Sequence, residues 1–208
     1  MKLSLTLLEV KDRKKLAIRL NKSNVNYFHI DVMDGKFVSR ETFSIEEIQE
    51  ISNVSNKPLD IHLMVEDPDI YIEQLIKLSN INNITFHLEI DKDINKILSK
   101  IKENGIKRGL AIKPDTDINL LKPYLDYIDL ILIMTVEPGY GGQPFIKSST
   151  KRIKKIKKLI KGYNILLEVD GGINDITIKE VSLVDTAVIG SYITNSDNME
   201  ERINNLLV

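Results

Sequence analysis

Short apolar runs alternate with longer amphipathic segments along this chain, and that alternation constrains its fold more than any other feature. Eight runs have the length and the β-branched, apolar composition of buried strands: residues 2–8, 27–33, 59–65, 83–89, 108–113, 128–136, 164–171 and 186–191. Four intervening segments place apolar residues three and four positions apart, as amphipathic helices do: residues 12–22, 67–79, 93–105 and 150–162. Asp67 and Pro68 have the character of a helix start, while Gly105 and Gly162 have that of helix ends.

Strands that alternate with helices pair in parallel through helical crossovers. Eight such units predict an α/β fold in which the parallel strands close into a (β/α)₈ barrel. An open, doubly wound sheet is the competing architecture, but it usually carries a glycine-rich loop after its first strand, and none follows residues 2–8. No linker or low-complexity stretch divides the chain, so we expect residues 1–208 to form one barrel domain.

Composition narrows the classes of function. The formal net charge is −1, which provides no overall field for nucleic acid or an anionic membrane. The basic run at residues 147–161 keeps an apolar stripe, so we interpret it as the solvated face of an outer helix. The absence of cysteine excludes disulfides and thiolate sites, and neither a signal peptide nor a membrane span is predicted. We expect a cytoplasmic protein without nucleic-acid or membrane partners, and homo-oligomerisation stays open.

Polar residues gather near the ends of the predicted strands. Alternation places His29 and Asp31 on one face of their strand, while His62 and Asp170 lie near the ends of two others. In (β/α)₈ barrels, the carboxyl ends of the strands meet at the active site. Two imidazoles and two carboxylates there predict a divalent-metal site, with Zn²⁺ favoured by the nitrogen ligands and Fe²⁺, Mn²⁺ or Co²⁺ as alternatives. For His87 and Glu89 we favour a structural or outer-shell role.

Methionines and glycines also collect at these ends. Met33, Met64 and Met134 could together line one side of a pocket, although each alone is typical of core packing. Glycines follow the sixth, seventh and eighth strands, at residues 139–142, 171–172 and 190. Because glycine has no Cβ atom, the backbone can approach a ligand closely at these positions. The loops after strands seven and eight often bind phosphate in these barrels.

Six segments resemble, in order and spacing, the motifs of the ribulose-phosphate 3-epimerase family: HIDVMDGKFV, KPLDIHLMVEDP, ITFHLE, MTVEPGYGGQPFI, EVDGGI and VIGS. The resemblance runs from about Lys2 to Ile193. It implies an isomerase with a (β/α)₈ barrel that interconverts D-ribulose 5-phosphate and D-xylulose 5-phosphate, a reaction of the pentose phosphate pathway.

Specific roles follow from this resemblance. His29, Asp31, His62 and Asp170 match metal ligands of the family, and Asp31 and Asp170 also match its two acid/base catalysts, which act on a 2,3-enediolate. The remaining matches imply substrate or phosphate contacts: Thr6, His62, Met33, Met64, Met134, Gly139, Tyr140, Gly141, Gly142, Gly171, Gly172, Gly190 and Ser191.

The sequence also departs from the family pattern. Leu5-Thr6 replaces Pro-Ser, Ser39-Arg40 replaces Pro-Asn, and Tyr140 replaces phenylalanine. Because the Ser39-Arg40 loop is expected to border the site, a 3-epimerase of a hexulose 6-phosphate, such as D-allulose 6-phosphate, stays open as an alternative. A lyase or decarboxylase on a related barrel is disfavoured, since the third strand lacks the Asp-x-Lys-x-x-Asp array of such enzymes. A non-catalytic sugar-phosphate sensor is disfavoured as well, because binding alone needs no acid/base pair.

Overall fold

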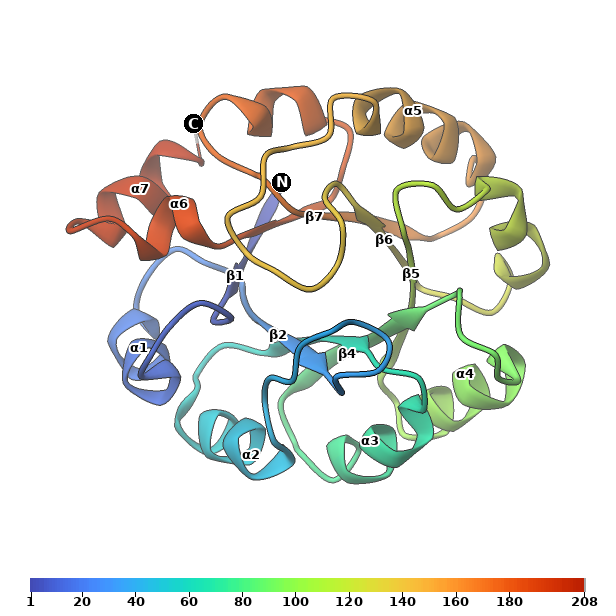
Figure 1. Ribbon diagram of the computed structural model, residues 1–208, viewed down its shortest axis with the longest axis horizontal. Coiled ribbons are helices and arrows are strands. Elements are labelled where there is room, and N and C mark those ends of the chain that lie inside the picture. The colour runs from blue at the N-terminus through green and yellow to red at the C-terminus, as the bar shows by residue number, and fades with distance from the viewer. Residues whose placement is uncertain (208) are drawn as a thin grey trace.

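A computed structural model describes residues 1–207, and its centre is a closed barrel of parallel strands in the order β1 to β8 (Figure 1). The strands are β1 (Lys2–Thr6), β2 (Tyr27–Met33), β3 (Leu59–Met64), β4 (Ile81–His87), β5 (Lys107–Ile112), β6 (Leu130–Met134), β7 (Leu166–Asp170) and β8 (Thr186–Ile189). Each of the eight predicted strands is confirmed, and most are shorter at one or both ends. The predicted barrel is therefore correct, and β1 closes it by pairing with β8.

Helices form an outer ring around the strands (Figure 1). They are α1 (Arg13–Leu20), α2 (Ile45–Val54), α3 (Pro68–Leu75), α4 (Ile94–Glu103), α5 (Ser149–Leu159), α6 (Ser191–Thr194) and α7 (Met199–Asn205). Short 3₁₀ helices, η1 (Ile118–Tyr124) and η2 (Thr177–Val181), take the place of full helices after β5 and β7. The four helical segments named from the sequence correspond to α1, α3, α4 and α5.

Local sequence explains most of the helix boundaries. Asp67 is the N-cap residue of α3 and Pro68 opens its first turn, although the Asp67 side chain pairs with Lys92 instead of capping the helix. Gly105 and Gly162 follow α4 and α5 with φ of 71° and 96°, a backbone conformation that glycine adopts without steric strain. On α5, Ile153 and Ile156 are buried while the lysines are exposed, as expected for a solvated outer face.

Strand register determines which side chains reach the barrel interior. Asp31 pairs with His62 across β2 and β3, and His29 pairs with Asp60. Residues of the opposite alternation, such as Phe28 and Ile30, are fully buried. Burying a side chain of this size contributes about 1.5–3 kcal/mol, so the apolar layer between the strands and the outer helices stabilises the fold. The barrel interior can then hold polar side chains.

Among residues 1–207, no helix is long and apolar enough to cross a membrane.

Candidate functional site

A cavity opens at the carboxyl ends of the strands, where the loops after β1, β6, β7 and β8 meet. The walls include nearly all the side chains and glycines expected to contact substrate: Thr6, Met33, Met64, Met134, Gly139, Tyr140, Gly141, Gly142, Gly171, Gly172, Gly190 and Ser191. The exception is His62, which is fully buried and lies outside the residues that line the cavity. Asp31 and Asp170 lie on the cavity surface, so both carboxylates can reach a bound molecule.

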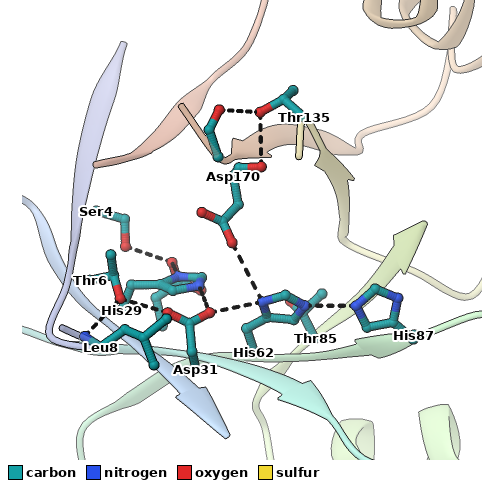
Figure 2. Close-up of polar contacts among 12 residues, drawn as sticks. Ser4, Thr6, Leu8, His29, Asp31, His62, Thr85, His87, Thr135 and Asp170 are labelled. Carbon is teal, nitrogen blue, oxygen red and sulfur yellow. Dashed lines mark hydrogen bonds and ion pairs between the residues drawn. The ribbon is translucent and has the colours of Figure 1, made fainter. Parts of the chain in front are cut away.

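His29, Asp31, His62 and Asp170 converge from three strands, as the sequence predicts. One possible ligand atom from each lies within 4.8 Å of the others. Asp31 Oδ1 is 3.1 Å from His29 Nε2 and 3.1 Å from His62 Nδ1. Asp170 approaches His62 Nδ1 from β7, across the barrel from β2, at 3.8 Å (Figure 2).

Asp31 is held as a carboxylate. Burial alone would raise its pKa, but the charge and hydrogen bond of His29 and the hydrogen bond of His62 hold the pKa well below its ordinary value. Thr6 Oγ1 donates to Asp31 Oδ2 at 2.6 Å, which makes the hydroxyl at this position a direct partner of the carboxylate. The serine-to-threonine departure in the sequence therefore keeps its hydrogen-bonding group.

Asp170 is in a different electrostatic state. Burial and the nearby charge of Asp31 raise its pKa to about 6, against the opposing influence of His29 and His62. The backbone at this strand end is fixed by Thr135, whose Oγ1 lies 2.8 Å from the carbonyl oxygen of Asp170 and 2.6 Å from that of Gly171 (Figure 2). The two aspartates thus have pKa values on opposite sides of the ordinary value, which suits one base and one acid.

His87 and Glu89 extend the cluster away from the cavity, through hydrogen-bond contacts that begin at His62. His87 Nε2 lies 3.0 Å from His62 Nε2, and His87 Nδ1 lies 3.0 Å from Glu89 Oε2. Burial lowers the pKa of His87 to about 4, so the ring is neutral at physiological pH. Glu89 also accepts hydrogen bonds from the backbone N–H of Lys113 and the hydroxyl of Thr116.

A second group of polar residues lies beneath the cluster and is absent from the sequence-based predictions. Asp60 Oδ2 accepts from Ser4 Oγ at 2.6 Å and lies 2.7 Å from His29 Nδ1, while Asp60 Oδ1 accepts from Asn83 at 2.7 Å. Burial and the charge of Asp60 raise the pKa of the neighbouring Glu168 well above its ordinary value. Alternation contains the signal that would have found this layer, since Asp60 precedes His62 by two residues and Glu168 precedes Asp170 by two.

Glycines let the loops around the cavity pack closely. A Cβ atom on Gly172, whose φ is 67°, would clash with the backbone of Phe145 in the loop after β6. A Cβ atom on Gly190 would come within 2.8 Å of the Thr6 methyl group. These contacts bring the ends of β7 and β8 against their neighbours, so a larger residue would displace the cavity wall.

The loop between β6 and α5 extends across the barrel opening in Figure 1 and is tied to two other loops. Arg40 pairs with Glu9, with Nη1 at 2.6 Å from Oε1, and Glu9 Oε1 also accepts from the Gly141 backbone N–H at 3.0 Å. The Arg40 guanidinium lies 5.6 Å from the centre of the Tyr140 ring. Arg40 and Tyr140, two departures from the family pattern, are thus neighbours at the cavity mouth.

The donor set of the four-residue cluster fits a divalent cation. Two imidazole nitrogens and two carboxylates are ligands that zinc and related transition metals accept. The donors converge on a buried point, and a cation there would offset the repulsion that raises the pKa of Asp170. The cluster is therefore able to hold a metal ion.

Comparison with known proteins agrees with this geometry. A family model described as the ribulose-phosphate 3 epimerase family matches residues 1–194. Ribulose-phosphate 3-epimerase of Helicobacter pylori (strain J99) is 39% identical over 188 residues, which cover 88% of this chain and 86% of the relative. The enzyme of that name from Bacillus subtilis (strain 168) is 39% identical over 158 residues, which cover 74% of this chain and 72% of the relative.

Solved structures support the fold independently. A tryptophan synthase structure from Mycobacterium tuberculosis aligns with a TM-score of 0.73 at 12% identity, covering 99% of this chain and 90% of that one. At so low an identity, the likeness bears on the barrel alone. The family match over nearly the whole chain and the relatives at 39% identity bear on the activity. On these grounds the chain belongs to the ribulose-phosphate 3 epimerase family and is an isomerase of the epimerase type.

Proposed function

We propose that this enzyme interconverts D-ribulose 5-phosphate and D-xylulose 5-phosphate by a metal-assisted mechanism with two aspartates as acid and base. The observation that carries the proposal is the placement of Asp31 and Asp170. Their carboxylates come from strands on different sides of the barrel, border one cavity, and converge on the same two histidines.

Inversion at carbon 3 of a 2-ketose removes a proton from one face and returns a proton to the other. Two acid/base groups on opposite sides of a flat 2,3-enediolate achieve this without turning the intermediate. Asp31, whose pKa is held low, is ionised and can accept the proton, while Asp170, from the other side of the cavity, carries the proton to be returned. The two roles are exchanged in the reverse direction. General acid–base catalysis of this kind accelerates a reaction by about 10²–10⁴-fold.

His29, Asp31, His62 and Asp170 are the residues that would hold the metal. A bound divalent cation would act as a Lewis acid that stabilises negative charge developing on the substrate oxygens. We favour zinc because of the two nitrogen ligands, with Fe²⁺, Mn²⁺ or Co²⁺ as alternatives.

The other cavity residues orient the substrate in this proposal. Gly171, Gly172, Gly190 and Ser191 lie where the loops after β7 and β8 meet, so their backbone N–H groups are suited to the phosphate of the sugar. Met33, Met64 and Met134 provide an apolar, polarizable wall beside the aspartates. The loop at residues 139–142 would exclude water from the intermediate when it closes.

A 3-epimerase of a hexulose 6-phosphate is the second candidate. Arg40 favours it, because this residue lies in a loop that departs from the family pattern and forms an ion pair with Glu9 at the cavity mouth. The chemistry at carbon 3 would be the same, and only the length of the sugar would differ.

The deciding experiment compares kcat/KM for D-ribulose 5-phosphate and D-allulose 6-phosphate, with the metal content of the same preparation measured by elemental analysis. We expect a clear preference for the pentulose and about one divalent ion per chain. A strong preference for the hexulose would replace the first proposal with the second. Turnover of neither sugar after metal is restored would reject both.

A further inference from the structure

We propose that Asp60 and the pair formed by His87 and Glu89 are positioning residues that hold the two histidine ligands in opposite tautomers. His29 then presents Nε2, and His62 presents Nδ1, to one common point. This inference rests on the proposed function in one respect, namely that the cluster holds a divalent metal.

The hydrogen bonds of Asp60 determine the tautomer of His29. Ser4 Oγ and Asn83 Nδ2 donate to the Asp60 carboxylate, at 2.6 and 2.7 Å, so its oxygens act as acceptors. His29 Nδ1, 2.7 Å from Asp60 Oδ2, must therefore carry a proton. The nitrogen that remains for a metal is Nε2, which faces Asp31 at 3.1 Å.

His62 is turned the other way, with Nδ1 facing Asp31 at 3.1 Å and Asp170 at 3.8 Å. For Nδ1 to bind a metal, the proton of the ring must be on Nε2, which lies 3.0 Å from His87 Nε2. His87 Nε2 must then accept, and the His87 proton lies on Nδ1, where Glu89 accepts it at 3.0 Å. Each step has an available partner, so Glu89 determines the tautomer of His62 through His87 (Figure 2 shows His62 and His87).

A competing interpretation treats His29, Asp60 and Glu168 as a second cation site, because one atom of each lies within 4.8 Å of the others. Glu168 Oε2 is buried and finds no hydrogen-bond partner among residues 1–207. A cation there would have to displace the proton on His29 Nδ1, and His29 would then bridge two ions. Asp60 already accepts from Ser4 and Asn83, which argues for the positioning role over the second ion.

The test uses zinc-loaded, ¹⁵N-labelled protein and long-range ¹H–¹⁵N correlation spectra of the imidazole rings. We expect His29 to be protonated at Nδ1 and metal-bound at Nε2, and His62 to be protonated at Nε2 and metal-bound at Nδ1. The reverse assignment of either ring would overturn the proposal, and so would two zinc ions per chain. Neither readout depends on turnover, so a protein with these spectra that does not epimerise D-ribulose 5-phosphate would reject the proposed function alone.

Variants test the outer residues by zinc affinity, measured in competition with a chromophoric chelator. Asp60→Asn and Glu89→Gln each replace an acceptor with a group that can donate, and we expect zinc affinity to fall about 10–100-fold. Asp129→Asn makes the same substitution at an ion pair with Arg108, away from the cavity, and should change the affinity less than twofold.

Ser4→Ala serves as a second variant in case Asp60→Asn fails to fold. It removes one donor to Asp60 and leaves the carboxylate in place, so we expect a fall in zinc affinity of a few fold. Zinc affinities of folded Glu89→Gln and Ser4→Ala that equal the parent value would contradict the proposal. A parent protein that binds no divalent metal would overturn both this inference and the metal-assisted function.

Discussion

The two aspartates at the cavity floor differ because their partners differ. Asp31 accepts a hydrogen bond from Thr6 at 2.6 Å and lies 3.1 Å from a nitrogen of each histidine, whereas Asp170 has one 3.8 Å contact with His62. Direct partners lower the pKa of the first, and burial beside a negative charge raises the pKa of the second. Two chemically identical side chains thus acquire different pKa values from their surroundings.

Asp31→Asn and Asp170→Asn should each reduce kcat for epimerisation by at least about 10²–10⁴-fold, because an amide cannot exchange a proton with carbon 3. A coupled assay for D-xylulose 5-phosphate measures the loss. We expect one of the variants to exchange the carbon 3 proton of one substrate with solvent, since the remaining aspartate serves one face. Near-parental epimerisation by either variant would refute the two-base assignment.

Thr6→Val should lower kcat, because it removes the hydroxyl that donates to Asp31. The fold should stay unchanged, because valine has the shape of threonine. A hydrogen bond to a charged group contributes about 1.5–3 kcal/mol. If all of this free energy lowers the activation barrier, its loss reduces kcat by roughly 10–150-fold. Thr6→Ser is the matched control, since it restores the hydroxyl and should return most of the activity. Equal rates for the valine and serine variants would show that the hydroxyl has no part in the reaction.

At this scale, sequence alternation predicts the four-residue cluster, and it marks the polar layer beneath the cluster without showing what that layer contacts. His29, His62 and Asp170 stand out because polar residues interrupt apolar strands. Asp60 and Glu168 show the same alternation, but whether an inward carboxylate bonds its neighbour depends on strand register. Sequence alone does not provide that register.

At the scale of elements, the strands were predictable and the loops and shorter helices less so. Buried strands appear as apolar runs in any sequence, whereas η1 and η2 lack the long apolar periodicity of a helix. The link between Arg40, Glu9 and Gly141 joins three loops that are far apart in the chain. Its existence depends on barrel closure and on loop conformations that no local pattern specifies.

Arg40→Ala should lower kcat/KM by roughly 2–5-fold, because an exposed ion pair worth up to about 1 kcal/mol no longer holds the loop at residues 139–142. Added salt should lower kcat/KM of the parent and have less effect on the variant, because salt screens the same pair. Lys14→Ala, which breaks an exposed pair with Glu50 between α1 and α2, is the control and should leave kcat/KM unchanged. Identical kinetics and salt dependence for the parent and Arg40→Ala would contradict this role of the loop contact.

Asp129 should stabilise the barrel in a pH-dependent manner at the β5–β6 pairing. Burial opposes its ionisation, but hydrogen bonds from the side chain and backbone N–H of Arg108 lower its pKa. A lowered pKa means that the contribution is complete above the ordinary value of 3.8 and is lost as the pH falls through the lower folded value.

Asp129→Asn should therefore lower the free energy of unfolding at pH 7 by about 1 kcal/mol, a modest figure because solvent screens this partly exposed pair. Denaturant titrations of parent and variant between pH 7 and pH 3 provide the measurement. A difference that stays constant from pH 7 to about 4 and then diminishes supports the assignment. A difference that grows with acid would contradict it.

For the whole molecule, the closed barrel is what makes the site. The cluster comes from β2, β3 and β7. More than a hundred residues of chain lie between β2 and β7. Closure through the pairing of β1 with β8 brings their carboxyl ends around one cavity. The same closure places Asp170 across the barrel from Asp31, which is the arrangement that an inversion requires (Figure 2).

The most direct test of this arrangement is the isotopic fate of carbon 3, followed by NMR during conversion of D-ribulose 5-phosphate in D₂O by the metal-loaded enzyme. Two acid/base groups on opposite faces predict that D-xylulose 5-phosphate forms with a solvent-derived deuteron at carbon 3. Conversion that keeps the original proton at carbon 3 in every product molecule would contradict the two-aspartate mechanism, because one group would then be carrying the same proton from face to face.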